Sequence, residues 1–152
     1  MLKVHVWMPN AEHVGHTALT INNVYVSFWP NGAAGKKDLK VKRSHPGAFM
    51  TSLQDDIINE GNRQPITVTL SEGVNESALM EYVKTLRGNT PRYQLARNNC
   101  SHIVAECLHI ACQKKPSFVP DASSYGRIVG LFLGRGIWTP DQILKYAREL
   151  AK

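Results

Sequence analysis

The sequence lacks any run of 18 or more consecutive apolar residues, which argues against a membrane-spanning helix. It also lacks low-complexity stretches, and its 43% hydrophobic and 20% charged residues are typical of a globular rather than a disordered chain. Residues 1–7 carry no basic run followed by an apolar block, so we expect no classical secretory signal. A chain of 152 residues is long enough to bury its own core, and we expect a single domain over residues 1–152.

Cysteine is scarce, and its spacing does not fit the usual structural uses. Cys100, Cys107 and Cys112 form an odd set within thirteen residues, which is a poor disulfide framework. They also lack the paired C-x-x-C spacing of a zinc site. We therefore expect reduced thiols, no metal and no cofactor. The predicted location is the cytoplasm, or outside the cell after export without a classical signal peptide.

Acidic residues are outnumbered, since 18 lysines and arginines against 12 aspartates and glutamates give a net charge of +6. The densest basic cluster, residues 36–43, fits a solvated loop or a lysine-rich edge strand. The alternative is a surface that binds an anionic partner, such as an acidic protein or an anionic membrane. No signature of an RNA-recognition or zinc-finger module accompanies the charge, so nucleic acid is not an expected partner.

Alternating apolar residues predict a small antiparallel sheet. Asn22-Asn23 favours a hairpin between two of the strands, because asparagine tolerates positive φ. On the strand that follows this turn, Tyr25, Ser27 and Trp29 share one face. The predicted strands are residues 2–8, 16–21, 24–29 and 65–70.

Apolar residues at helical spacing predict helices beside this sheet, and the fold class is therefore α+β. Asn75 is expected to cap one helix, and Thr139-Pro140-Asp141-Gln142 has the pattern of a capping box. Residues 123–136 are apolar and rich in glycine, and they fit either a broken helix or a loop packed on the core. The predicted helices are residues 53–59, 75–88, 98 or 99 to 113, and 139–150.

Cys100 is the strongest candidate nucleophile, because it falls in the first turn of a predicted helix. The N–H groups and the positive dipole end there stabilise a thiolate and a developing oxyanion. Cys107 and Cys112 lie deeper in the helix and fit core or half-buried positions.

A thiolate nucleophile needs a proton acceptor, and six histidines compete for this role. His102 is two positions from Cys100 and points to a different side of the helix, while His109 is far along the axis. His16 opens a predicted strand after Gly15. The residues alone leave open whether His16 is a base or a hydrogen-bonded structural residue.

Two segments together resemble the circularly permuted papain-like fold: Gly15-His16-Thr17-Ala18-Leu19 and Asn98-Asn99-Cys100-Ser101-His102-Ile103. That group includes the PPPDE deSUMOylating isopeptidases and the lecithin:retinol acyltransferase family, and it is related to NlpC-type peptidases. The tract of residues 25–30 is similar to the strand after the histidine in bacterial members. The resemblance covers residues 2–112. It implies a small antiparallel sheet packed against helices, Cys100 as nucleophile at a helix N-terminus and His16 as base.

The same resemblance implies a third polar residue that orients the histidine from a neighbouring strand. Ser27 is the candidate, with Asn22 and Asn23 as weaker ones. A serine departs from the His, Asn, Gln or Asp usual at this position, so a plain Cys-His dyad is the alternative. The expected oxyanion hole uses the N–H of Cys100 and a second donor, and His102 is expected to be structural. The tryptophans fit core or groove-wall positions, with substrate stacking by one of them as the alternative: Trp7, Trp29 and Trp138.

The resemblance implies a peptidase or amidase that acts on a protein or peptide through a thioester, as in bacterial toxin-like effectors or domains of larger toxins. One alternative is an acyltransferase or thioesterase that acts on lipid. The other is a non-catalytic module that binds nucleic acid or protein through its basic surface. The identity of the catalytic pair does not choose among these chemistries.

Overall fold

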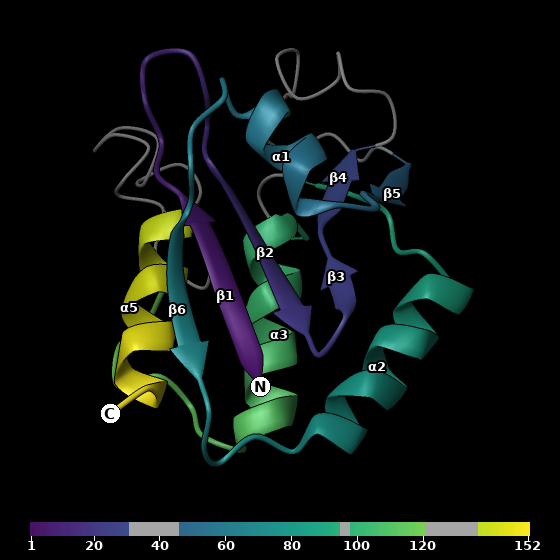
Figure 1. Ribbon diagram of the computed structural model, residues 1–152, viewed down its shortest axis with the longest axis vertical. Coiled ribbons are helices and arrows are strands. Elements are labelled where there is room, and N and C mark those ends of the chain that lie inside the picture. The colour runs from purple at the N-terminus through teal and green to yellow at the C-terminus, as the bar shows by residue number, and fades with distance from the viewer. Residues whose placement is uncertain (31–45, 95–97, 121–136) are drawn as a thin grey trace.

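The computed structural model describes residues 1–30, 46–94, 98–120 and 137–152 (Figure 1). Within these ranges the chain is α+β, as predicted, with a four-stranded antiparallel sheet in the order β3-β2-β1-β6 and a separate two-stranded sheet, β4-β5. The strands are β1 (Leu2–Trp7), β2 (His16–Ile21), β3 (Val24–Val26), β4 (Phe28–Pro30), β5 (Gly47–Phe49) and β6 (Ile66–Leu70).

The predicted hairpin between β2 and β3 is confirmed, and Asn22 takes the positive φ of 54° that the turn needs. The single strand predicted for residues 24–29 is wrong. The chain leaves the main sheet after Val26, and Ser27 separates β3 from β4. The Ser27 carbonyl accepts a hydrogen bond from Met50 N at 2.9 Å, which ties this point of the chain to the segment that follows β5. The partner strand β5 was not predicted.

The predicted helices are confirmed with small changes at their ends. Asn75 and Asn99 cap their helices through side-chain oxygens that accept backbone N–H bonds. The predicted capping box is wrong, because the Thr139 hydroxyl donates to the Asp141 carboxylate at 2.5 Å and makes no cap bond. Residues 123–136 lie outside the described ranges. The helices within those ranges are α1 (Leu53–Asn59), α2 (Glu76–Gly88), α3 (Cys100–Cys112) and α5 (Pro140–Leu150).

Helices cover both faces of the main sheet. On one face, Val4 and Leu19 belong to the large core shared with α2, α3 and α5. On the other face, Ala18 and Tyr25 pack in a smaller cluster with Ile57 of α1. Figure 1 shows α1 near the end of the sheet where β2 begins. The beginning of β2 is therefore placed where α1 and α3 approach the sheet from opposite sides.

None of the helices in the described ranges is both long enough and apolar enough to span a lipid bilayer. The basic cluster at residues 36–43 lies outside the described ranges.

Candidate active site

Cys100 is the first residue of α3 and therefore lies in the first turn of the helix, as predicted. Asn99 is the N-cap, with its side-chain oxygen accepting from His102 N at 2.9 Å and its Nδ2 donating to Trp138 O at 2.9 Å. No acidic side chain lies in the first turn of α3, so the positive end of the helix dipole is not neutralised there by the helix's own residues. Cys100 is 5% exposed. The dipole end favours a thiolate at this position, whereas burial of the side chain opposes it.

His16 is the first residue of β2 and is fully buried. Its ring packs between those of Trp7 and Trp29, with centroids 5.7 and 4.6 Å away. Its Nε2 lies 2.7 Å from Ser27 Oγ, so the structure brings together two of the three predicted site residues. The weaker candidates, Asn22 and Asn23, follow the opposite end of β2, about 16 Å along a six-residue strand. They are too far from His16 to orient it.

Sequence reasoning missed Asp56, a fully buried carboxylate in the first turn of α1. Its Oδ2 lies 3.3 Å from His16 Nε2 and accepts a hydrogen bond from Ser27 Oγ at 2.5 Å. The Tyr25 hydroxyl also donates to Oδ2, and Trp29 Nε1 donates to Oδ1 at 2.8 Å. Three donors and one histidine thus surround a single carboxylate.

These contacts keep Asp56 ionised at neutral pH. Burial on its own would raise the pKa of the Asp56 carboxyl. The hydrogen bond and charge of His16, with the hydrogen bonds from Ser27 and Tyr25, outweigh burial and hold this pKa below its ordinary value. The same environment strongly raises the pKa of the Tyr25 hydroxyl, first through burial and then through the Asp56 charge, so Tyr25 remains a donor.

The hydrogen bonds also assign the tautomer of His16. A serine hydroxyl has one hydrogen, and Ser27 gives it to Asp56, an ionised group that only accepts. Ser27 Oγ must therefore accept from His16, so His16 Nε2 carries a proton. In the neutral ring, the basic lone pair is then on Nδ1.

A signal for Asp56 was present in the sequence. Strand alternation puts Tyr25, Ser27 and Trp29 on one face, and all three donate to Asp56. A row of buried donors requires an acceptor nearby. The short helix predicted at residues 53–59 supplies it, although the sequence does not show that this helix folds over that strand.

The beginnings of β2 and α3 are joined by one buried hydrogen bond. Thr17 Oγ1 and Ser101 Oγ are 3.1 Å apart, and both side chains are buried. Each of these residues directly follows one of the predicted catalytic residues, His16 and Cys100. Helix α3 also packs against β4, the strand of Trp29, whose ring lies against that of His16. The Cys100 end of α3 is thereby anchored to the end of the sheet that holds His16.

The structure also describes the surroundings of the other two thiols and of His102 and His5. Burial raises the pKa of the Cys107 and Cys112 thiols, which are buried and half-buried as predicted. His102 Nδ1 lies 3.1 Å from the Asn99 side-chain oxygen, within the helix cap. His5 Nδ1 lies 3.0 Å from Thr67 Oγ1 and Nε2 lies 2.9 Å from Thr20 Oγ1.

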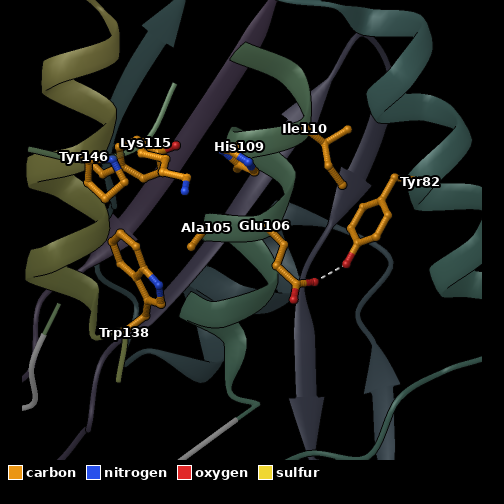
Figure 2. Close-up of a pocket in the computed structure, with 9 residues that line it drawn as sticks. Tyr82, Ala105, Glu106, His109, Ile110, Lys115, Trp138 and Tyr146 are labelled. Carbon is orange, nitrogen blue, oxygen red and sulfur yellow. Dashed lines mark hydrogen bonds between the residues drawn. The ribbon is translucent and has the colours of Figure 1, made fainter. Parts of the chain in front are cut away.

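The tryptophans divide between core and pocket. Trp7 and Trp29 are buried, whereas Trp138 lines a cavity of about 490 Å³ over α3, between α2 and α5 (Figure 2). Charges of both signs line this cavity, from Glu106 and Lys115, and Tyr82 donates a hydrogen bond to Glu106. The α3 residues that line it begin at position 105, about 7 Å along the helix from its first residue. The cavity is therefore distinct from the predicted catalytic residues.

Within the described ranges, no three His, Cys, Asp or Glu side chains are grouped so that they could hold a metal ion. Comparison of the chain with models of protein families, with curated proteins and with solved structures finds no match.

Proposed function

We propose that this protein is a cysteine hydrolase, a peptidase or amidase, with Cys100 as nucleophile and His16 as general base. The observation that carries the proposal is the hydrogen bond from His16 Nε2 to Ser27, which leaves Nδ1 as the basic nitrogen. The Thr17–Ser101 contact supports it, because it anchors the two elements that begin with His16 and Cys100.

The reaction follows from these roles. The Cys100 thiol transfers its proton to His16 Nδ1, and the thiolate attacks the carbonyl carbon of an amide. The N–H groups of the first turn of α3 stabilise the resulting oxyanion. When the intermediate collapses, the C–N bond breaks and Nδ1 returns the proton to the leaving amine. Water then attacks the thioester with Nδ1 again accepting a proton, and the acid is released with the Cys100 thiol restored.

The chain order supports a circularly permuted papain-like arrangement as part of this proposal. The histidine strand, β2, precedes the cysteine helix, α3, and the two pack together. The proposed substrate is a protein or peptide amide, as the resemblance of the two sequence segments implies.

The test is the alkylation rate of each thiol near neutral pH. Iodoacetamide is added to the folded chain, and the modified peptides are quantified by mass spectrometry over time. We expect Cys100 to react at least tenfold faster than Cys107, whose thiol is fully buried and has a raised pKa. His16→Ala should slow Cys100 by a similar factor, whereas the matched control His102→Ala should leave its rate within about twofold.

Equal rates at all three thiols, or a Cys100 rate unaffected by His16→Ala, would overturn the proposal. In a second experiment, amide cleavage is measured with fluorogenic peptides, and Cys100→Ala serves as the inactive control. Transfer of acyl groups from lipid esters without peptide cleavage would assign the same residues to an acyltransferase instead.

A further inference from the structure

We infer that Asp56 is the positioning residue of this site and that it acts on His16 through Ser27. This inference rests on the proposed function, because it gives Asp56 a role in the transfer of a proton between Cys100 and His16. It places the third polar group of the site on α1, outside the strand that holds Ser27.

The first argument is the cost of burying the carboxylate. A fully buried charge is tolerated only where hydrogen bonds and an opposite charge offset its lost hydration. Tyr25, Ser27 and Trp29 all donate hydrogen bonds to Asp56, and two of these three bonds end at Oδ2, the oxygen that also lies 3.3 Å from His16 Nε2. This part of the structure is built around a negative charge beside the histidine.

The second argument is geometric. Ser27 Oγ is 2.5 Å from Asp56 Oδ2 and 2.7 Å from His16 Nε2, whereas the direct distance between Oδ2 and Nε2 is 3.3 Å. Each of the two contacts made by the hydroxyl is therefore shorter than the direct contact between the carboxylate and the ring. A serine in place of a longer polar residue is explained if it connects the ring to a charge instead of supplying the orienting group itself.

The third argument concerns the charge that forms during the reaction. When His16 takes the thiol proton, the ring becomes a cation, and a carboxylate within 4 Å favours that cation. Asp56 thus stabilises the thiolate–imidazolium pair relative to the neutral thiol and imidazole. It also holds the proton on Nε2, which keeps Nδ1 as the nitrogen that exchanges with the thiol.

The pH dependence of Cys100 alkylation tests this role. The titratable groups that act on Asp56 are His16 of β2 and Tyr25 of β3; at longer range Asp56 acts on His5 of β1, and Asp55 of α1 acts on Tyr25. Asp56→Asn keeps the shape of the side chain and removes its charge. We expect this substitution to move the pH profile of the Cys100 alkylation rate to higher pH by about one unit. Below the inflection of the profile, the rate should then be about tenfold lower. Ser27→Ala should shift the profile in the same direction, while the matched control, Asp55→Asn, should not move it.

Cys107 monitors folding in the same experiment, because a variant that opens will alkylate this fully buried thiol. A purely structural role for Asp56 would raise Cys107 labelling without moving the profile measured on the folded fraction. If Asp56→Asn fails to fold, Ser27→Ala carries the test, since it leaves Asp56 with Trp29 and Tyr25. An unmoved profile in either folded variant, with His16→Ala still slowing Cys100, would overturn this inference and leave the proposed function standing. If His16→Ala has no effect, the proposed function itself fails.

Discussion

Replacing Asp56 with alanine tests how strongly the buried network holds α1 on the sheet. The substitution removes the charged acceptor of the Tyr25 hydroxyl and of Trp29 Nε1, while Ser27 Oγ keeps its contacts with His16 Nε2 and Trp29 Nε1 at 2.7 and 3.0 Å. A buried donor that loses its partner costs about 1–3 kcal/mol, and removal of one member of a buried ion pair costs about 3–5 kcal/mol. We therefore expect Asp56→Ala to lower the free energy of unfolding by about 3–5 kcal/mol.

Asp55 is the matched control, because it is an exposed aspartate in the same turn of α1. Asp55→Ala should cost less than about 1 kcal/mol, the scale of a helix-dipole contribution at the surface. Both free energies come from urea unfolding at pH 7, followed by tryptophan fluorescence and circular dichroism. Because the pKa of Asp56 is lowered by folding, its contribution exists above the ordinary pKa of about 4 and is lost as the pH falls below it. Two variants within about 1 kcal/mol of each other at pH 7 would refute the network's role in stability.

Two further predictions concern positions outside the site. Burial, together with the Lys3 charge, lowers the pKa of His5 to about 4, so His5 is neutral when folded. Its stabilisation is complete above about pH 6.5 and declines as the pH falls toward 4, so urea midpoints at pH 7 and pH 5 should differ less in His5→Gln than in the parent chain. Gln113 ends α3 at a φ of +56°, and Gln113→Gly should raise the free energy of unfolding by about 0.5–1 kcal/mol, seen as a higher Tm. An unchanged or lower Tm would show that the Gln113 side chain contributes more than its backbone strain costs.

Much of the fold was predictable because it depends on local patterns. Strand alternation, the Asn22-Asn23 turn and the caps at Asn75 and Asn99 each act within a few residues, and the structure contains all of them. The helix position of Cys100 was predictable for the same reason. The contact between His16 and Ser27 was expected from the resemblance, which implies an orienting polar residue, and strand alternation made Ser27 the candidate for that role.

The errors arise where long-range contacts override a local pattern. Residues 24–29 alternate like one strand, yet Met50 bonds to the Ser27 carbonyl and the chain turns into a second sheet. Thr139 matches a capping box, yet its hydroxyl bonds to Asp141. Asp56 was missed because no local sequence pattern indicates which buried hydrogen-bond donors the short helix α1 will cover.

The break after Val26 also explains why a serine suits this position. Ser27 lies between two strands that belong to different sheets, where its carbonyl is held by Met50 and its hydroxyl lies between His16 and Asp56. A carboxylate side chain at this position would supply the charge itself, without α1. A short hydroxyl makes the site depend on α1 for its charge, so the orientation of His16 is coupled to the docking of a helix that follows it by more than thirty residues. The break between β3 and β4, which the sequence did not predict, is thus the feature that connects the histidine to its carboxylate.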